Sequence, residues 1–135
     1  MDDCLFCKII NGEIPSYKVY EDNDILAFLD IAPISYGHTL VVPKKHYCNF
    51  EEIPKEDLCQ IIKAVKKIGK AFKYGLDLKG YNIQVNNGPV AGQVIPHLHF
   101  HLIPRKSDDG LKLWPQGKYS DGKAEEVLKK IKKEL

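Results

Sequence analysis

The chain has 135 residues, of which 44% are hydrophobic and 28% are charged, and its formal net charge is +2. This length allows one domain with its own hydrophobic core, and the composition is that of an ordinary globular protein. The charge is too small to indicate a surface that binds nucleic acid. No apolar stretch approaches the roughly 20 residues that cross a bilayer, and Met1-Asp2-Asp3 is not an apolar leader. We therefore expect a cytoplasmic protein without a membrane segment, in which the four cysteines stay reduced.

Short apolar runs bounded by turn-forming residues are typical of β-strands. Such runs lie at residues 17–21, 24–30, 38–42, 81–85 and 97–103. Between the third and the fourth run, residues 54–74 carry apolar side chains at helical spacing and predict one long helix that stops at Gly75. A last helix is expected after Asp121, which can cap it. The sequence contains no repeat and no sign of a second domain.

Three of the five histidines lie in one seven-residue stretch, from His97 to Ile103. The imidazoles alternate strictly with Leu98, Phe100 and Leu102, as in a half-buried strand with its apolar side chains on the core face. Three titratable rings in such a row are rarely needed for packing alone. Two interpretations stay open: a metal site, or nucleophilic catalysis by a neutral imidazole at phosphorus or at an acyl carbon.

A second motif, Cys4-x2-Cys7, opens the chain. In a cytoplasmic protein this spacing is typical of half a zinc site or of a redox pair, and the redox pair expects a βαβ context that this N-terminus lacks. Half a zinc site needs two more ligands. The candidates are His46, Cys48, Cys59 and a histidine of the 97–103 stretch, and spacing does not choose among them.

The stretch from His97 to Ile103 resembles the signature of the histidine triad (HIT) family, His-φ-His-φ-His-φ-φ, where φ is apolar. The resemblance covers nearly the whole chain, and its further segments resemble the Hint branch of nucleotide-binding phosphoramide hydrolases. These segments are residues 6–10, 13–15, 27–30, 37–46 and 92–93. The resemblance implies an α+β HIT-like fold, with an antiparallel sheet of about five strands, one long helix and a C-terminal helix. It also implies a single HIT domain over residues 1–135, which forms a homodimer.

The resemblance assigns catalytic roles to three histidines. The family nucleophile is the middle histidine of the triad, here His99, which attacks the α-phosphorus of a nucleoside monophosphate joined to a leaving group. A covalent nucleotidyl-histidine forms, and water then releases the monophosphate, an AMP-like or GMP-like product. His101 would bond the phosphate or the bridging oxygen and stabilise the charge that develops there. His38 would support the nucleophile from behind the triad.

The same resemblance assigns a nucleotide pocket. Asp30 matches the acidic residue that holds the ribose hydroxyls, Asn86 matches an amide that contacts phosphate, and Gln93 belongs to a matching segment of the binding site. The residues that match the base pocket are Leu5, Phe6, Ile9, Phe28 and Ile31. An apolar pocket of this kind selects a purine by shape rather than by strict hydrogen bonding. No organic cofactor is implied.

The resemblance also chooses among the zinc candidates. Many microbial members carry Cys-x2-Cys near the N-terminus, and these cysteines join the histidine after Lys-Lys and the first histidine of the triad. The matching residues here are Cys4, Cys7, His46 and His97. A closed set of two cysteines and two histidines implies a structural Zn²⁺ ion.

One position departs from the family pattern. Many eukaryotic members have a hydroxyl residue that assists the leaving group after Gly92-Gln93, whereas this chain has Val94. General acid catalysis typically contributes about 10²–10⁴-fold, so slower turnover is expected, with a preference for leaving groups that need less protonation. The expected function is a purine nucleoside phosphoramidase of the adenosine type. The alternatives are a diadenosine polyphosphate hydrolase and a nucleotide-binding module with little turnover.

Overall fold

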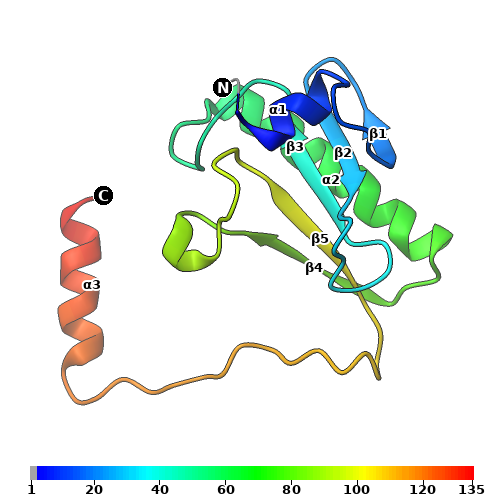
Figure 1. Ribbon diagram of the computed structural model, residues 1–135. Coiled ribbons are helices and arrows are strands. Elements are labelled where there is room, and N and C mark those ends of the chain that lie inside the picture. Colours follow the sequence, from blue (N-terminus) through cyan, green and yellow to red (C-terminus); the bar gives the residue numbers. More distant parts are fainter. Residues whose placement is uncertain (1–2) are drawn as a thin grey trace.

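A computed structural model of the protein describes residues 3–135 and has an α+β architecture, in which helices pack on an antiparallel sheet (Figure 1). The elements are α1 (Leu5–Ile10), β1 (Lys18–Glu21), β2 (Ile25–Leu29), β3 (Thr39–Pro43), α2 (Lys55–Gly75), β4 (Gly80–Val85), the 3-10 helix η1 (Pro89–Ala91), β5 (Phe100–Arg105) and α3 (Lys123–Lys133). The predicted fold class, the five strands and both predicted helices are therefore confirmed.

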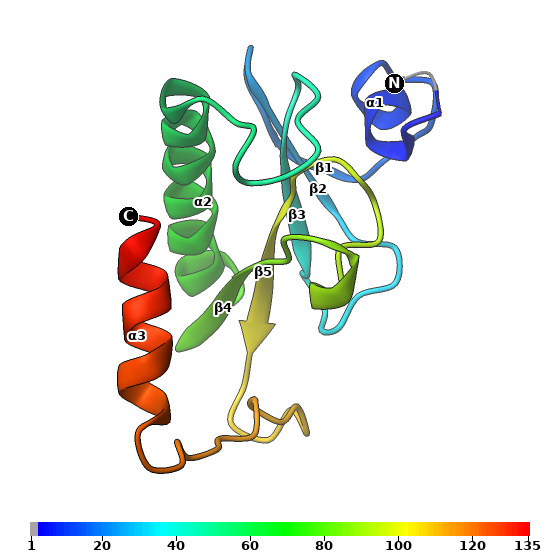
Figure 2. The same ribbon diagram turned by 90° about the vertical axis from the view of Figure 1, so that its left-hand side faces the viewer.

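The sheet has the strand order β1-β2-β3-β5-β4, and every neighbouring pair is antiparallel. Helix α2 covers one face and α1 covers part of the other (Figure 2). Strands β2 and β3 are buried on both faces, which explains why they read as continuous apolar runs. Their alternate residues feed two cores: Ile25, Ala27 and Val41 pack on the α2 side, and Leu26 and Phe28 on the α1 side.

Strand β5 begins at Phe100, three residues later than the sequence predicts. The residues before it leave the ladder because the backbone N–H of Leu98 donates to the carbonyl of Tyr47, at 2.7 Å, instead of to a strand. The predicted alternation still holds, since Leu98, Phe100 and Leu102 all lie in the α2-side core. The three histidines are consequently held by two kinds of backbone, irregular before Phe100 and regular after it.

Two helices depart from the sequence predictions. Helix α1 was not predicted, because six residues are too few to show a helical period. Helix α3 is capped by Gly122, in the left-handed region at φ 76°, and not by Asp121.

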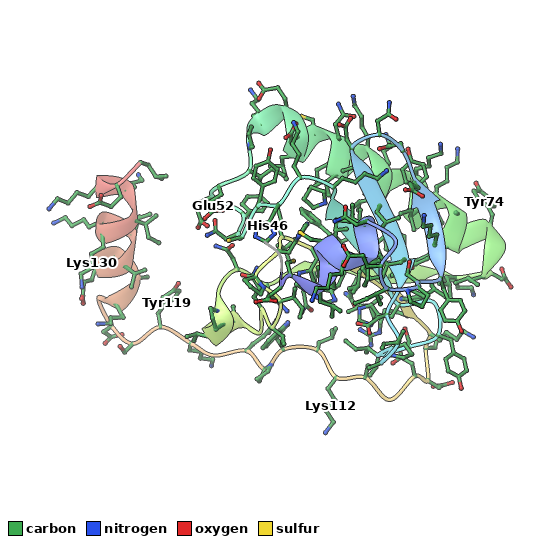
Figure 3. The ribbon with its side chains drawn as sticks, turned by 45° about the horizontal axis from the view of Figure 1, so that its top comes forward. His46, Glu52, Tyr74, Lys112, Tyr119 and Lys130 are labelled. Atoms are coloured by element: carbon green, nitrogen blue, oxygen red, sulfur yellow. The ribbon has the colours of Figure 1, made fainter. Side chains whose placement is uncertain are left out.

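The C-terminal arm, residues 111–122, has no regular structure and carries α3 away from the sheet (Figures 1 and 3). Trp114 on this arm is 82% exposed, and Leu128 and Ile131 on α3 are more than half exposed. Within residues 3–135, no helix combines the length and the apolarity needed to span a membrane.

Helix α2 approaches the sheet closely at Gly69. A Cβ added there would lie 2.5 Å from Cζ of Tyr81, and closer still to its hydroxyl. The ring of Tyr81 is itself packed edge-on against Phe72, so it cannot move freely. Helix α2 can therefore pack on β4 only because this position has no side chain.

We expect Gly69→Ala to lower the free energy of unfolding by about 1–3 kcal/mol, the usual cost of overpacking, although alanine is the better helix former. The control is Gly75→Ala in the same helix, where an added Cβ meets nothing within 4 Å. Urea denaturation of both variants measures the difference. Equal stabilities for the two variants would contradict the close contact with Tyr81.

Candidate active site and metal centre

A cavity of about 310 Å³ lies on the α1 side of the sheet, between α1, the start of β1 and the loop that precedes β5. The residues predicted from sequence that line it are Leu5, Phe6, Ile9, Phe28, Asp30, Ile31, His99 and His101. Most of this lining is apolar, and the polar groups gather where Asp30 and the two imidazoles meet. The structure therefore brings the predicted base, ribose and phosphate positions to one pocket.

His99 is held as a neutral imidazole with a free Nε2. Its Nδ1 lies 2.7 Å from the carbonyl oxygen of His97, which can only accept, so Nδ1 carries the proton. Burial lowers the pKa of His99, which favours the neutral ring. Since a neutral imidazole has one N–H, the lone pair of Nε2 is available for attack on a bound substrate.

A chain of hydrogen bonds fixes which ring nitrogen of His101 carries the proton. The backbone N–H of Ile34 donates to Nδ1 of His38 at 3.1 Å, so His38 carries its proton on Nε2. That Nε2–H donates to Nδ1 of His101 at 2.9 Å. Burial lowers the pKa of both rings, that of His101 to about 4. His101 therefore keeps its proton on Nε2 and can donate it to an oxygen in the pocket.

Asp30 lies beside this chain at the end of β2. Its Oδ1 accepts the backbone N–H of Ala32 at 2.9 Å, and its Oδ2 lies 3.8 Å from Nδ1 of His38. Because His38 is neutral and its Nδ1 already accepts from Ile34, this contact is not a charged pair. The carboxylate keeps free lone pairs toward the pocket, where it can accept two vicinal hydroxyls.

Asn86 and Gln93 do not reach the pocket lining. The Gln93 amide accepts from the Gly88 backbone N–H at 2.9 Å and donates to the carbonyls of Cys48 and Ile95, at 2.6 and 3.3 Å. The Asn86 amide contacts the side chain of Gln84 and the carbonyl of Gly92. Both side chains shape the loop from 86 to 96, which brings Gly92 and Val94 to the pocket.

Some pocket residues have no counterpart among the predicted ones. They are Ile14, Pro15, Ser16, Leu40, Gly92 and Ile95, together with Leu29, whereas Val94, which also lines the pocket, is the position expected beside the leaving group. The alternation of β3 could have found Leu40, since the buried side of a neighbouring strand follows from period 2. Residues 14–16 carry no such signal, because they reach the pocket only through the turn that follows α1.

A second cluster lies behind the pocket, where the four predicted metal ligands meet. The donor atoms of Cys4, Cys7, His46 and His97 all lie within 4.8 Å of one another. Cys7 Sγ is 3.3 Å from Nδ1 of His46 and 3.6 Å from Nδ1 of His97, which also lies 3.5 Å from Cys4 Sγ. Two thiols and two imidazole nitrogens gathered so closely form a donor set that could hold a metal ion.

The protonation of this cluster suits a metal. Nε2 of His97 donates to the carbonyl of Pro43 at 2.8 Å, so the lone pair is on Nδ1 and points at the sulfurs. Burial lowers the pKa of His97 to about 4. Burial, and then the neighbouring Cys4, raise the pKa of the Cys7 thiol to about 11. The Cys7 thiol therefore holds its proton in the absence of a cation, whereas a bound metal ion would stabilise it as the thiolate.

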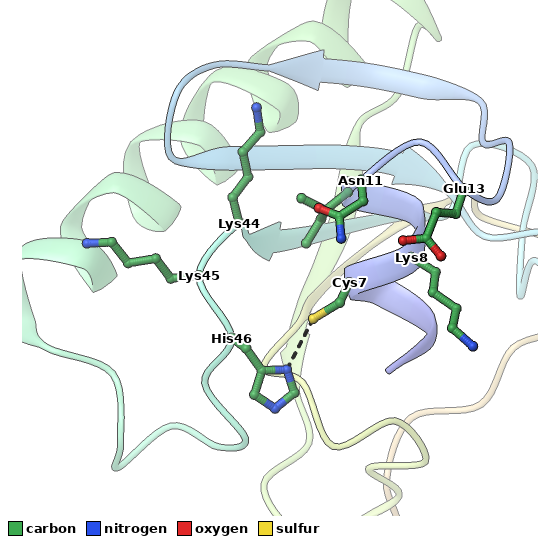
Figure 4. Close-up of a pocket in the computed structure, with 8 residues that line it drawn as sticks. Cys7, Lys8, Asn11, Glu13, Lys44, Lys45 and His46 are labelled. Atoms are coloured by element: carbon green, nitrogen blue, oxygen red, sulfur yellow. Dashed lines mark hydrogen bonds between the residues drawn. The ribbon is translucent and has the colours of Figure 1, made fainter. Parts of the chain in front are cut away.

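The metal cluster is reached from solvent on one side. A shallow cavity of about 570 Å³ opens onto Cys7 and His46 (Figure 4). Two of the three lysines that line it are paired, since Lys44 lies 3.0 Å from Glu21 and Lys45 lies 3.3 Å from an aspartate on α2, and Lys8 is the third. The cavity therefore exposes the cluster to small solutes.

Comparison with known proteins gives one consistent result. A family model described as "HIT domain" matches residues 11–108. An uncharacterized HIT-like protein of Methanocaldococcus jannaschii is 56% identical over 96% of this chain and 98% of its own length. An adenosine 5'-monophosphoramidase, HNT1 of Candida albicans, is 43% identical over 98% of this chain and 91% of its own length.

Solved structures of similar proteins point to the same family as the sequence comparisons. A crystal structure of a HIT family member from Bacillus subtilis has a TM-score of 0.89 and 42% identity, and the match covers 98% of this chain and 97% of that one. A zinc-bound histidine triad family protein from Mycobacterium smegmatis has a TM-score of 0.79 and 31% identity, covering 99% of both chains.

The lowered pKa values of His38 and His101 predict acid sensitivity. Both rings stay neutral in the folded chain below their ordinary pKa of 6.5, whereas the unfolded chain takes up protons there. The contribution of these two rings to the free energy of unfolding is therefore fully present above pH 6.5 and is lost as the pH drops toward 4. His101→Asn should flatten this decline by up to about 1 kcal/mol per pH unit. Denaturant titrations from pH 7.5 to 4.5 measure both slopes, and identical slopes would refute the assignment to His101.

Proposed function

Because the chain belongs to the histidine triad family, we propose that it is a hydrolase that cleaves nucleoside 5'-phosphoramidates of the adenosine type. The observation that carries this proposal is the fixed protonation of His99, whose free Nε2 belongs to a pocket with one carboxylate and an apolar lining. The Candida albicans relative named an adenosine 5'-monophosphoramidase supports the choice of an amide leaving group.

The reaction proceeds in two steps. Nε2 of His99 attacks the α-phosphorus, the P–N bond breaks, and a covalent nucleotidyl-histidine forms. The Nε2–H of His101 donates to an oxygen of the phosphoryl group and stabilises the charge that develops there. Water then attacks the same phosphorus and releases a nucleoside monophosphate. The leaving amine takes its proton from solvent, because Val94 at the pocket, 84% exposed, has none to give.

The pocket binds the nucleotide through an apolar region, which selects the base by shape, and through a carboxylate, which binds the ribose. The base packs among Phe6, Ile9 and Phe28, which offer contact area but no hydrogen bonds to its edge. The ribose hydroxyls donate to Asp30. This division favours purines over smaller bases and ribose over deoxyribose.

A diadenosine polyphosphate hydrolase is the second candidate. The specific observation that favours it is Val94, which offers no proton to a leaving amine. A nucleotide phosphate leaves without that proton. The same two steps at His99 then release two nucleotides instead of a nucleotide and an amine.

We propose that the Cys4, Cys7, His46 and His97 cluster holds a structural Zn²⁺ ion. A tetrahedral ion with Zn–S near 2.3 Å and Zn–N near 2.0–2.1 Å separates sulfur and nitrogen ligands by about 3.6 Å. The sulfur–nitrogen distances of 3.3, 3.5 and 3.6 Å are close to this value. The zinc-bound Mycobacterium smegmatis relative supports the choice of metal. With four protein donors, the ion would stabilise the fold and leave no open position for substrate.

We further propose that the protein is a cytoplasmic homodimer and that residues 1–135 act as one domain. All four cysteines are free, which supports a reducing compartment. Among residues 3–135, strand β4 pairs with β5 alone and ends the sheet on that side, and Ile83 on it is 53% exposed. Such an edge favours pairing with another chain. Sedimentation velocity tests the dimer, and a monomer at micromolar concentration would rule it out.

The function is tested by turnover of an adenosine phosphoramidate and of diadenosine tetraphosphate, with wild type and with His99→Ala. We expect faster cleavage of the phosphoramidate by wild type, and a loss of at least about 10³-fold in the variant, because no other neutral imidazole has a free Nε2 in the pocket. Quenching wild type with alkali during turnover should trap a nucleotide on His99, because a P–N bond to imidazole survives base and is hydrolysed in acid; mass spectrometry of the peptide, kept out of acid, detects it.

Other outcomes of this experiment have definite meanings. Faster cleavage of the tetraphosphate would establish the second candidate. If wild type turns over neither substrate while His99→Ala still binds AMP, the protein is a nucleotide-binding module. Full activity of His99→Ala on either substrate would exclude His99 as the nucleophile.

Cys4→Ser tests the metal centre. We expect the variant to lose bound zinc and to melt at a lower temperature than wild type, because a serine hydroxyl does not replace a thiolate ligand. The matched control is Cys59→Ser, which removes an exposed thiol on α2 that does not belong to the cluster. Metal analysis by mass spectrometry and thermal melts give the two readouts. Unchanged zinc content and melting temperature in Cys4→Ser would exclude the site.

A further inference from the structure

A third sulfur lies against the proposed metal cluster. Nδ1 of His46 faces Cys7 Sγ at 3.3 Å, and Nε2 of the same ring faces Cys48 Sγ at 3.6 Å. The Cys7 contact is drawn in Figure 4, on the side of the ring toward α1. Each nitrogen of His46 therefore has a different sulfur as its neighbour, one within the four-ligand set and one outside it.

The two sulfurs cannot play the same part. An imidazole that binds a metal through Nδ1 is neutral and carries its only proton on Nε2. Metal-bound histidines nearly always donate this second N–H to an acceptor, which fixes the orientation of the ring. For His97 the acceptor is the carbonyl of Pro43, at 2.8 Å. For His46 the group in the corresponding place is Cys48 Sγ. A thiol sulfur is a weak hydrogen-bond acceptor, so it can take this N–H.

The loop holds Cys48 in place from both sides. Its backbone N–H donates to Oε2 of Glu52 at 2.9 Å, and its carbonyl accepts from Nε2 of Gln93 at 2.6 Å. Figure 3 shows Glu52 in the same part of the molecule as His46. Because its backbone N–H and C=O are both engaged, the backbone of Cys48 is held beside His46, and its sulfur lies 3.6 Å from Nε2 of that ring. The half-buried sulfur is thus aimed at the ring of His46.

We propose that Cys48 is a positioning residue of the metal centre, whose sulfur accepts the Nε2–H of His46 and keeps Nδ1 turned toward the ion. This inference rests on the zinc site proposed above. It assigns Cys48, one of the four ligand candidates left open by spacing, to the second layer of the site rather than to the ion itself. It also connects the metal centre, through Gln93, to the loop that borders the active-site pocket.

The test is Co²⁺ and Zn²⁺ binding to the full-length protein, in competition with a chromophoric chelator. We expect Cys48→Ala to bind both ions about 10-fold more weakly, the lower end of the usual effect of losing such an acceptor. The thiolate-to-cobalt absorption should keep its wild-type intensity, because Cys4 and Cys7 remain as ligands. Cys48→Ser should recover part of the affinity, since a hydroxyl also accepts an N–H.

Two controls separate positioning from general destabilisation. Cys59→Ala removes the other non-ligand cysteine, which is exposed on α2, and should bind metal as wild type does. The metal-free forms of Cys48→Ala and wild type should melt at the same temperature, because the contact with His46 acts on the bound ion.

Wild-type affinity in Cys48→Ala would overturn the proposal. A loss of thiolate-to-cobalt absorption in that variant would also overturn it, because Cys48 would then be a ligand. If wild type itself binds neither ion, the zinc site fails and this inference fails with it. That result differs from the first two, in which wild type binds metal normally.

Discussion

Three histidines of the two centres, His38, His97 and His99, each meet a backbone group of fixed polarity, and this decides which ring nitrogen carries the proton. Carbonyls of His97 and Pro43 take the N–H of His99 and His97, and the N–H of Ile34 occupies a lone pair of His38. Backbone groups do not titrate or rotate away, so the lone pairs keep their directions. The proposed nucleophile, proton donor and metal ligands can therefore lie within a few residues of one another without exchanging roles.

Helix α1 contributes residues both to the pocket and to the cysteine–histidine cluster. Its six residues are too few to be stable alone, yet they supply Leu5, Phe6 and Ile9 to the pocket wall. The Phe6 ring packs edge-on against both His97 and His99, with centroids 5.9 and 5.1 Å away. Because Cys4 caps this helix and Cys7 lies within its first turn, a group that binds both sulfurs also holds the pocket wall against His99. The proposed metal ion would thus affect substrate binding without touching the substrate.

Local patterns predicted the sheet well but not the path of the chain around the site. Alternation placed Leu98, Phe100 and Leu102 in the core, since period 2 depends only on neighbouring residues. It could not show that the strand begins at Phe100, because that depends on the hydrogen bond from Leu98 to Tyr47. Likewise, the motif directed attention to His99, but spacing could not separate Cys48 from the ligand candidates. Cys48 can be told from the ligands only by the path of the loop after β3, and no local sequence pattern predicts that path.

Val94 lies on an irregular loop, is 84% exposed and borders the pocket. Substitutions at such surface positions usually change the free energy of unfolding by less than about 0.5 kcal/mol. Val94, which the proposed reaction sets beside the leaving group, can therefore mutate with little penalty to folding, whereas the buried histidines cannot. Descendants of one scaffold are free to diverge in which bond they cleave fastest while the chemistry at phosphorus stays the same.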